Sequence, residues 1–536
     1  MFSLLRQISH NLPVGLIVVV LTFLNSPPAY SAVDTEKTKK VQFLITSDLH
    51  GRLSTSFIYP SRRRSGLLHI TSIIRRERQR NPAAILIDCG DLLQGSPLVH
   101  YFNRFSAKPS DQNPFFKTFL SLKYDAVVVG NHDLAINPLF ESEYLKHANF
   151  SWLGANVFRG GAQLVHPYIT FNRKGLKITV IGITSPGVRM WVSAEQLAGI
   201  NVGPIKGSLE KWLKQIKKKE SPDLVIGAFH AGLNPFRDDI NSKLSRIPPA
   251  NGAKAAIGAV KGIDIAFLGH DHTLSPKDSK QGLIYVGDTP VISGGRWGEA
   301  VVSVDLHLKK NNDSWKIVKI DKKILRADQN RKIDKTYKKK LPTEYRSYIN
   351  GRLPYVFGRT TRREAEKCLN QLVAIANDDK EADGTMLPSV SIYKLNRYFE
   401  RNIVRRDLFH WLPYDNRAVV VPLSAREIGL IFEKYAPQTK ESSYHYKSIY
   451  PRMKKKIQYS GEGKWWLDAG DFEKKYKILV SDYHHQGGGG VFTQFFINLR
   501  KPRRITPIYL RDQLFSFLAE PNEKLPNSCR FLKHSK

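Results

Sequence analysis

The sequence predicts an α/β protein of two domains, and three observations lead to this prediction. Residues 41–325 alternate short apolar runs with longer amphipathic stretches, which is the pattern of strands and helices packed in layers. Residues 326–352 are polar and lysine-rich without a sustained apolar period, which indicates a linker with some helical character. Residues 353–520 alternate again, and we expect them to form the second domain.

The individual helices and strands follow from local patterns. In the first domain, LLHITSIIRRERQR (67–80) and SLEKWLKQIKKKE (208–220) carry apolar residues at helical spacing. In the second domain, REAEKCLNQLVAIAND (363–378) predicts a helix, RAVVVPLS (417–424) a strand and AREIGLIFEKYA (425–436) another helix.

The chain begins with the features of a secretory signal. Arg6 precedes the apolar stretch LPVGLIVVVLTFL, and PPAYSA supplies small residues at Ala29 and Ser31. We therefore expect a signal peptide over 1–31 that is cleaved near Ser31, and a secreted or periplasmic protein of about 500 residues. Retention of the uncleaved segment as a membrane anchor is the alternative. No other stretch of the sequence is apolar enough to span a bilayer, so no stable anchor is predicted.

The composition is strongly basic. Lysine and arginine number 83 against 48 acidic residues, giving a formal net charge of +35. Such a charge attracts phosphate esters, nucleic acids and anionic lipids alike, and a solvated basic surface explains most of it. The runs RKIDKTYKKK (331–340) and RMKKK (452–456) lack the interleaved aromatics of a single-strand-binding groove, so no specific nucleic-acid partner is predicted.

The three cysteines, Cys89, Cys368 and Cys529, lie too far apart in the sequence to form a metal motif. Their odd number excludes a framework in which every cysteine is paired. Cysteine chemistry is therefore not expected to carry the function.

Polar side chains follow five apolar runs of the first domain, at the point where each predicted strand ends. In parallel sheets, ligands bind beyond the carboxyl ends of the strands, so we expect these side chains to gather at one edge. Residues two apart in an extended segment point to the same side and can present a pair of ligands. The five sets are Asp48 with His50, Asp91, Asn131 with His132, His230, and His270 with His272.

Carboxylate oxygens and imidazole nitrogens together suit a first-row divalent metal. Seven such ligands are too many for one ion, and a carboxylate such as Asp91 can bridge two. The set therefore favours a two-metal site that activates a water for in-line attack on phosphorus. Ordinary turn chemistry is the alternative for each residue alone, but it does not supply metal ligands at five strand ends out of five.

The motifs SDLHG, GDLLQGSP, GNHD, the isolated His230 and GHDH, in that order, resemble the calcineurin-like metallophosphoesterases. This resemblance implies a four-layer β-sandwich flanked by helices. In the second domain, LFHWLPYDNRAVVVPLSAREI, YSGEGKW and DYHHQGGGG resemble the nucleotidase branch of that family, which implies an α/β substrate-binding domain. GDLLQGSPL and GGRWGEAVVSVDL are most similar to the bacterial periplasmic 2',3'-cyclic-nucleotide 2'-phosphodiesterase/3'-nucleotidase group.

The resemblance also implies roles for the strand-end residues. Two divalent ions (Zn, Mn or similar) are expected, one held by Asp48, His50, Asp91 and His272, the other by Asp91, Asn131, His230 and His270. His132 is the expected catalytic residue, facing the substrate, while Asp133 has no assigned role. Many nucleotidases of this branch have an Asp three residues after the histidine that orients its ring, and this chain has Ala135 there.

Four second-domain residues are the expected substrate contacts: Arg363, Asn416, Tyr483 and Phe492. The positions at which we looked for base-sandwiching rings hold Ala418 and Val491, so we expect the base to be held loosely. Core packing for Tyr483 and Phe492, and an ordinary exposed helical position for Arg363, are the alternatives.

The sequence thus predicts an exported phosphoesterase that hydrolyses nucleotides, with 2',3'-cyclic nucleotides and 3'-nucleotides as the expected substrates. A 5'-nucleotidase or nucleotide-sugar hydrolase is one alternative. A non-catalytic protein that binds anions on the same fold is another, and the oligomeric state is left open.

Overall fold

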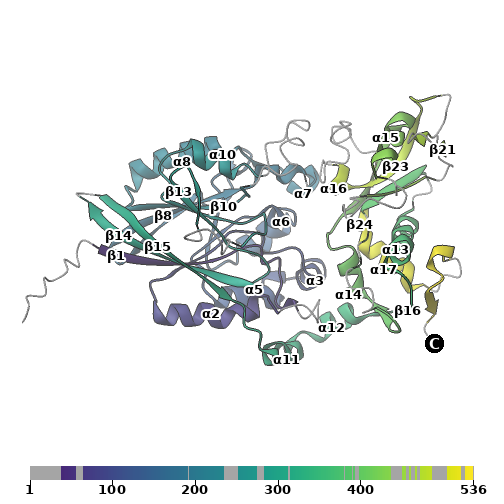
Figure 1. Cartoon of the computed structure of the whole chain (residues 1–536), viewed down its shortest axis with the longest axis horizontal. Coiled ribbons are helices and arrows are strands. Elements are labelled where there is room, and N and C mark those ends of the chain that lie inside the picture. Colours follow the sequence, from purple (N-terminus) through teal and green to yellow (C-terminus); the bar gives the residue numbers. More distant parts are fainter. Residues whose placement is uncertain are drawn as a thin grey trace, which may run out of the picture.

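The computed structural model of the chain has two lobes (Figure 1). The first lobe consists of the elements up to residue 326, and the second lobe of those from residue 352 onward. The predicted signal peptide lies outside the described residues. The structure describes residues 38–55, 64–190, 192–233, 251–274, 283–311, 314–378, 381–388, 390, 392, 398–435, 449–453, 458–459, 465–466, 471–485, 504–520 and 525–534.

Two six-stranded sheets form the centre of the first lobe. The first sheet has the order β15 (Ser314–Arg326), β14 (Ala300–Asn311), β1 (Thr38–Thr46), β2 (Ile85–Asp88), β3 (Ala126–Val128) and β4 (Ser151–Leu153). The second has the order β12 (Ile284–Val286), β13 (Thr289–Ser293), β11 (Ile265–Leu268), β10 (Leu224–His230), β8 (Leu176–Thr184) and β7 (Tyr168–Arg173). β1 to β3 pair in parallel, as do β10 and β11.

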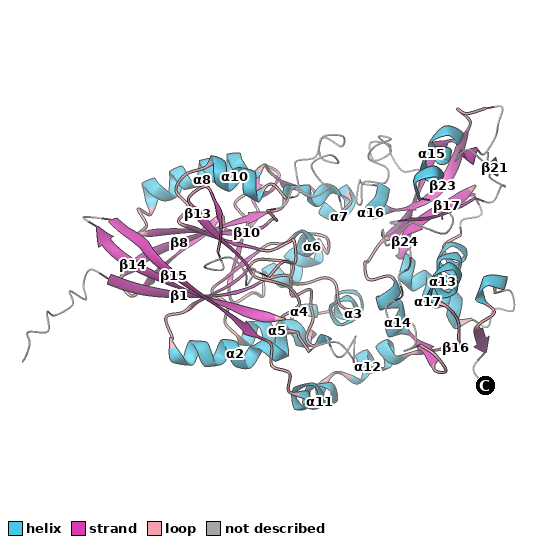
Figure 2. Ribbon diagram, in the orientation of Figure 1, coloured by secondary structure: helices cyan, strands magenta, loops and turns pink. Residues whose placement is uncertain are grey.

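The two sheets pack face to face, and helices cover their outer faces (Figure 2). Phe43 of β1 meets Phe267 of β11 in the core between the sheets, with ring centroids 5.3 Å apart. Helices α2 (Leu67–Arg80) and α5 (Pro114–Ser121) cover the first sheet, and α8 (Ile205–Lys219) and α10 (Ala253–Ala259) cover the second. Because both faces of the central strands β1, β2, β3, β10 and β11 are buried, these strands appear in the sequence as nearly continuous apolar runs. The expected four-layer α/β fold is confirmed.

Two helices occupy the segment that the sequence indicated as a linker. They are α11 (Arg331–Lys340) and α12 (Thr343–Asn350). α12 packs on α3 (Pro97–Phe105) of the first lobe, where the Tyr345 ring lies 5.6 Å from Tyr101 and 6.4 Å from Phe102. The two buried side chains of α12, Tyr345 and Ile349, are enough to dock this short helix on the first lobe. This part of the chain is therefore more ordered than its polar composition indicated.

The second lobe is built on a five-stranded sheet with the order β20 (Ile449–Met453), β17 (Gly384–Pro388), β23 (Lys475–Ser481), β19 (Arg417–Ser424) and β24 (Arg504–Tyr509). A three-stranded sheet joins β18 (Asn402–Val404), β16 (Arg352–Phe357) and β25 (Leu532–His534). The helices are α13 (Arg362–Ala376), α14 (Arg405–Trp411), α15 (Ala425–Tyr435), α16 (Asp482–His485) and α17 (Leu510–Ala519). The helices predicted at 363–378 and 425–436 and the strand predicted at 417–424 are confirmed.

A disulfide joins Cys368 of α13 to Cys529, just before β25, while Cys89 is a buried free thiol. The three cysteines of the sequence left this pairing open. Within the residues that the structure describes, no helix is both long and apolar enough to cross a membrane.

Candidate active site

The five predicted strand ends meet at one place in the first lobe. They come from two facing sheets and not from one: β1, β2 and β3 belong to the first sheet, and β10 and β11 to the second. The edge expected of a single sheet is therefore shared between two, since the sheets pack with the carboxyl ends of these strands at the same end (Figure 1).

Three side chains form a first candidate metal-ligand group: Asp48, His50 and His272. The Nε2 atoms of His50 and His272 lie 3.0 Å apart. Asp48 Oδ1 lies 3.9 Å from the first of these nitrogens and 3.4 Å from the second. Three ligand atoms thus converge on one point at the end of β1.

A second group consists of Asp91, His230 and His270. Asp91 Oδ2 lies 3.2 Å from His230 Nε2 and 3.7 Å from His50 Nε2 of the first group, so this carboxylate stands between the two groups. Asn131 Oδ1 lies 3.0 Å from His230 Nε2. All seven residues predicted as ligands are therefore brought together, with Asp91 at the shared position.

Five of these seven residues have left-handed backbone. The φ angles are 51° for Asp48, 49° for His50, 60° for Asp91, 79° for His270 and 58° for His272. Left-handed backbone costs a residue other than glycine roughly 1–2 kcal/mol. β1, β2 and β11 are therefore each followed by left-handed turns that carry the ligand side chains, at a conformational cost.

Two backbone carbonyls fix the orientation of the histidine rings. His50 Nδ1 is 2.8 Å from the Gln94 carbonyl oxygen, and His230 Nδ1 is 2.7 Å from that of Cys89. A carbonyl only accepts, so each Nδ1 must carry the hydrogen and donate it. Each Nε2 is thereby directed toward the carboxylates, as a ring nitrogen that binds a metal should be.

Burial lowers the pKa of His50 and of His270 to about 3, so both rings are neutral at pH 7 and keep a lone pair. Burial acts in the same direction on His230, but the Asp91 carboxylate beside it outweighs burial and raises the pKa to about 10. His230 Nε2 faces two oxygens, and a positive charge, either a proton or a metal ion, is the favoured occupant of that point.

The donor set fits divalent cations. Asp48 is fully buried, and within the described residues its Oδ1 accepts no hydrogen bond although two imidazole nitrogens point toward it. A buried carboxylate oxygen left without a donor is costly unless a cation lies against it. Neutral imidazoles and carboxylates in two groups that share Asp91 are ligands for two first-row metal ions.

Asp133 organises the loops that carry these ligands. Its Oδ1 accepts hydrogen bonds from the backbone N–H of Leu92 and Leu93, at 2.9 and 2.8 Å. Its Oδ2 accepts from the N–H of Asp91 at 3.1 Å and of Gly130 at 2.9 Å. Asp133 therefore ties the loop after β2 to the loop after β3, a role that the sequence left unassigned.

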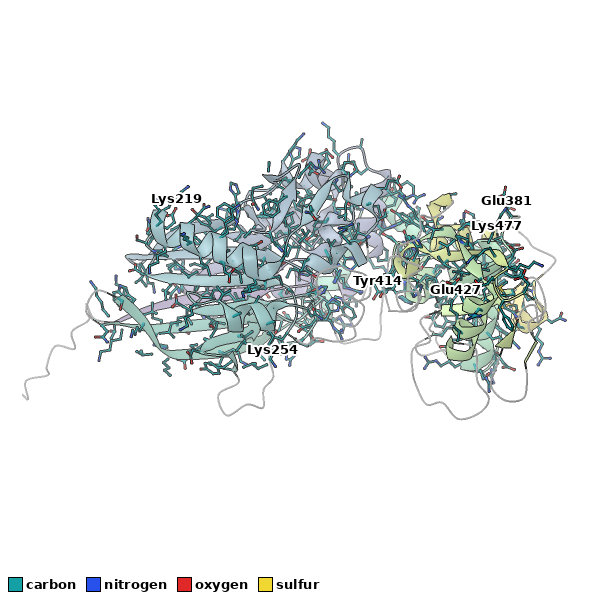
Figure 3. The ribbon with its side chains drawn as sticks, turned by 90° about the horizontal axis from the view of Figure 1, so that it is seen from above. Lys219, Lys254, Glu381, Tyr414, Glu427 and Lys477 are labelled. Carbon is teal, nitrogen blue, oxygen red and sulfur yellow. A yellow bond between two sulfur atoms is a disulfide. The ribbon has the colours of Figure 1, made fainter. Side chains whose placement is uncertain are left out.

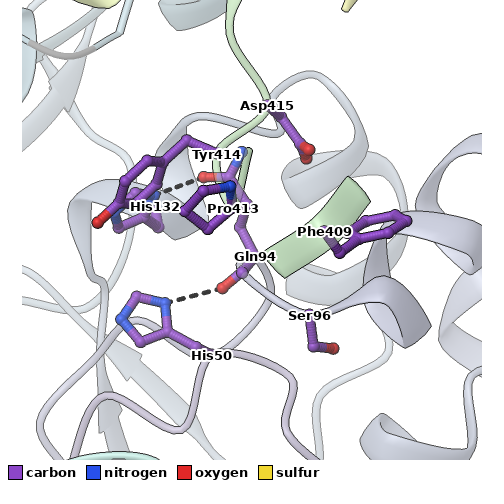
Figure 4. Close-up of a pocket in the computed structure, with 9 residues that line it drawn as sticks. His50, Gln94, Ser96, His132, Phe409, Pro413, Tyr414 and Asp415 are labelled. Carbon is purple, nitrogen blue, oxygen red and sulfur yellow. Dashed lines mark hydrogen bonds between the residues drawn. The ribbon is translucent and has the colours of Figure 1, made fainter. Parts of the chain in front are cut away.

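His132 lies at the mouth of this cluster, where α6 (Asn131–Leu134) begins. Its backbone N–H donates to Asp91 Oδ1 at 2.8 Å, and its Nδ1 lies 2.5 Å from Oε1 of Gln94 (Figure 4). Its imidazole lines a pocket together with His50, Gln94, Gly95 and Ser96. Among the expected site residues, His132 and the ligand candidate His50 are thus the two that line the pocket.

The opposite wall of the pocket comes from the second lobe. Phe409, Pro413, Tyr414 and Asp415 line it. Tyr414 is 63% exposed, lies between the two lobes, and its ring stands beside His132 (Figures 3 and 4). A pocket with rings on one wall and polar groups on the other suits a small molecule that has an apolar and an anionic part.

An ionic network lies behind this wall and joins the lobes. Asp415 binds the buried Arg511, and its carboxylate lies 3.1 Å from His100 Nδ1 of α3. Arg104 of α3 reaches Asp512 at 3.1 Å. Burial alone would raise the pKa of Asp415, but His100 and Arg511 outweigh it and hold the pKa far below its usual range. The second-lobe wall is thereby fixed to the first lobe.

Comparison with known proteins agrees with this geometry. Residues 41–274 match the family model of the calcineurin-like phosphoesterases. These residues form a calcineurin-like phosphoesterase domain. The chain is 27% identical over 331 residues to a 2',3'-cyclic-nucleotide 2'-phosphodiesterase/3'-nucleotidase of Yersinia enterocolitica, covering 57% of this chain and 48% of the relative. It is 31% identical over 207 residues to a 5'-nucleotidase of Vibrio cholerae, covering 37% of this chain and 35% of the relative.

The fold of both lobes also has a solved counterpart. A putative 5'-nucleotidase from Staphylococcus aureus superposes with a TM-score of 0.70 at 20% identity, covering 91% of this chain and 98% of that structure. The likeness therefore extends beyond the phosphoesterase domain to the second lobe. The chain spans about half or less of the length of the first curated relatives that it matches.

The four residues expected to bind substrate differ in where they lie relative to the pocket. Asn416 adjoins the lining residue Asp415, and its carbonyl accepts the N–H of Leu510. Arg363 is exposed on α13 and Tyr483 is half-buried on α16, and the described lining of the pocket includes neither. Phe492 lies outside the described residues.

Of the lining residues of the pocket, sequence reasoning had named only His50 and His132 as site residues, and Gln94 and Tyr414 are the most informative of those it missed. Gln94 stands within the GDLLQGSP motif, but its bond to His132 crosses between two loops and has no sequence signature. Tyr414 stands in PYDN, four residues before the buried Ala418 at which we looked for a ring. The aromatic wall is therefore present in the structure at a different register from the one expected.

Proposed function

We propose that the chain is an exported phosphoesterase that hydrolyses nucleotides at a two-metal centre, chiefly 2',3'-cyclic nucleotides and 3'-nucleotides. The observation that carries the proposal is the pair of ligand groups sharing Asp91, of which His50 also lines the pocket opposite the Tyr414 wall. The match to the calcineurin-like phosphoesterases supports the reaction class. The names of the Yersinia and Vibrio relatives support nucleotides as substrates.

Asp48, His50 and His272 would hold one ion and Asn131, His230 and His270 the other, with Asp91 between them. Two bound ions would polarise a phosphoryl oxygen and acidify a water for in-line attack on phosphorus. Other groups of the chain orient the metal ligands. The carbonyls of Gln94 and Cys89 hold two ligand rings in the binding orientation, and Asp133 holds the loops that carry Asp91 and Asn131.

His132 is the acid of the proposed reaction. Its Nδ1 is engaged by Gln94, so Nε2 is the nitrogen available to donate a proton to the departing ribose oxygen as the P–O bond breaks. Tyr414, the exposed ring of the pocket wall, would stack on the base, and a ring face accepts every base. We therefore expect weak discrimination among bases.

The motifs GDLLQGSPL and GGRWGEAVVSVDL favour the cyclic phosphodiesterase group over the 5'-nucleotidases. The second candidate function is 5'-nucleotidase activity, which the 31% identity to the Vibrio relative favours. The Cys368–Cys529 disulfide supports export, because disulfides persist in oxidising compartments and are rare in the cytosol.

The test is an assay of the metal-loaded chain with all four 2',3'-cyclic nucleotides beside a 3'-nucleotide, 5'-AMP and a nucleotide sugar. Elemental analysis should find two ions per chain. His132→Ala should keep both ions and lower turnover by on the order of 10²-fold or more. Preference for 5'-AMP would select the second candidate. Two bound ions without turnover of any substrate would select the anion-binding alternative.

A further inference from the structure

Gln94 contacts two histidines of the candidate active site with two different groups. Its backbone carbonyl accepts from His50 Nδ1 at 2.8 Å, and its side-chain Oε1 lies 2.5 Å from His132 Nδ1. Both bonds are drawn in Figure 4. His50 belongs to a ligand group and His132 does not, so one residue contacts both the metal cluster and the proposed acid.

The loop that carries Gln94 is held close to the His50 ring. Gly95 has a φ of 117°, and a Cβ built at that position would lie 2.9 Å from His50 Nδ1. A side chain at position 95 would therefore push the loop away from the ring. The next residue, Ser96, also anchors the loop, since its hydroxyl donates to the Gly51 carbonyl at 2.7 Å. The amide of Gln94 is thus presented to His132 from a loop with little freedom.

The side-chain bond selects one form of the His132 ring. Gln94 Oε1 can only accept, so His132 Nδ1 carries the hydrogen and Nε2 is left for the substrate. Position 135, three residues after His132, is an alanine and offers no acceptor side chain. Without Gln94, the ring could carry its hydrogen on either nitrogen and could rotate about its side-chain bonds.

We propose that Gln94 is the positioning residue of His132: its side-chain oxygen holds the Nδ1–H form of the ring, so that Nε2 faces the phosphate ester. This inference rests on the proposed function. The form of His132 that donates a proton carries hydrogens on both nitrogens, with Nδ1–H bound to Gln94 and Nε2–H facing the substrate. In the reaction, a water oxygen would form a bond to phosphorus, the P–O bond to the ribose would break with its electron pair staying on the ribose oxygen, and that oxygen would take the proton from Nε2. The ring is then left in the Nδ1–H form that Gln94 already binds.

The two bonds of Gln94 make the proposal separable from metal binding. The bond to His50 comes from the backbone and survives replacement of the side chain, whereas the bond to His132 does not. Gln94→Ala should therefore keep two ions per chain and a wild-type KM for 2',3'-cyclic nucleotides. Its kcat should fall by roughly 10- to 100-fold, since the acid remains but is not oriented. Gln94→Glu, whose carboxylate accepts the same bond, should restore most of the loss.

Two further readouts separate positioning from general damage. On bis(4-nitrophenyl) phosphate the loss in Gln94→Ala should be less than about threefold, because nitrophenolate departs without a proton. The ¹⁵N shifts of the His132 ring in the metal-free chain, assigned by comparison with His132→Gln, should move from the Nδ1–H form toward a mixture. Gln163→Ala, which removes a glutamine elsewhere in the same lobe, is the matched control and should change neither.

Unchanged ring shifts and a wild-type kcat in Gln94→Ala would overturn the proposal. Loss of metal, or an equal loss on both substrate types, would assign Gln94 a structural role and overturn it as well. The ring shifts need no substrate or metal. If the wild-type chain hydrolysed no phosphate ester, the proposed function would fail on activity, while the shifts would still report whether Gln94 holds the ring.

Discussion

The two walls of the pocket are built in different ways. On the first-lobe wall, His50 and His132 belong to a cluster whose candidate ligands stand at strand ends, are mostly buried and are oriented by backbone carbonyls and by Asp133. On the second-lobe wall, a single segment from Phe409 to Asp415 supplies every lining residue, and Tyr414 is exposed. That segment is held by the core side chains Trp411 and Leu412 and by charged side chains behind it.

The first wall is suited to catalysis and the second wall to substrate recognition. Side chains on strand ends between two packed sheets have little freedom, which suits groups that must hold a fixed geometry. A segment on an exposed edge can change its side chains without disturbing a core, which suits contacts that select a substrate. Changes in the first wall should therefore act on turnover and metal content, and changes in the second wall on KM and on the docking of the lobes.

The largest effect is expected at Asp91, the carboxylate shared by both ligand groups. Asp91→Ala should lower the affinity of both sites for their metal ions, because one carboxylate serves both. Turnover should fall by at least about 10³-fold, since the reaction needs both ions in place. Elemental analysis and steady-state kinetics measure the two effects. Asp271→Ala, between the two ligand histidines of GHDH, is the control and should keep both ions. Loss of only one ion would show that Asp91 does not bridge.

The next largest effect is expected behind the second wall. Asp415→Asn leaves Arg511, which is 1% exposed, without its carboxylate, and should lower the free energy of unfolding by about 3 kcal/mol. Because the pKa of Asp415 is depressed in the fold, this contribution is present above the unfolded pKa of about 3.9 and is lost as pH falls through the folded value.

Denaturant titrations of wild type and Asp415→Asn should therefore differ from pH 5 to 8 and converge in acid. The exposed pair of Glu473 with Arg426 gives the control, and Glu473→Gln should change stability little. A constant difference down to pH 2 would contradict the assignment of the effect to the carboxylate charge.

A smaller effect is expected at Asp133, within the first wall. Each carboxylate oxygen of Asp133 accepts two backbone N–H groups. In Asp133→Asn, one oxygen remains to accept two of them, and the side-chain NH₂ group faces the other two N–H groups. We expect a loss of about 2 kcal/mol in the free energy of unfolding. Metal affinity should fall as well, since the loops that carry Asp91 and Asn131 lose their connection. Isothermal titration with Mn²⁺ measures this, and unchanged affinity would contradict the role of Asp133.

The smallest effect is expected at Tyr414. Tyr414→Ala should raise KM for cyclic nucleotides by roughly tenfold, within the 1–3 kcal/mol of one stacked base, and leave kcat within about threefold. Phe472→Ala removes another exposed ring of the second lobe outside the pocket lining and should change neither. A large loss of kcat in Tyr414→Ala would remove the separation between the two walls.

The first wall was largely predictable from the sequence. Each of its ligand candidates follows an apolar run, and the period-two spacing of Asp48 with His50 and of His270 with His272 is a local signal. The division of these strands between two sheets was not predictable from those signals. Local patterns define a strand, but its neighbours depend on pairing between segments far apart in the chain.

The second wall was predicted poorly for the same physical reason. The PYDN segment was visible, but which of its side chains faces His132 depends on how two lobes dock, and no periodicity sets that register. Gln94 is similar, since only the approach of two loops gives its amide a partner. The Cys368–Cys529 pairing likewise needs the fold, because three cysteines allow three pairings.

The left-handed backbone at five ligand positions affects how they would change in evolution. These positions are Asp48, His50, Asp91, His270 and His272. At these positions the preferred residue for folding is glycine, and asparagine comes next, so carboxylate and imidazole are kept there against conformational preference. In a lineage released from the reaction, substitution toward glycine would relieve this backbone cost. The five positions would then be the first to drift, and their identity in any descendant would record whether the chemistry was still under selection.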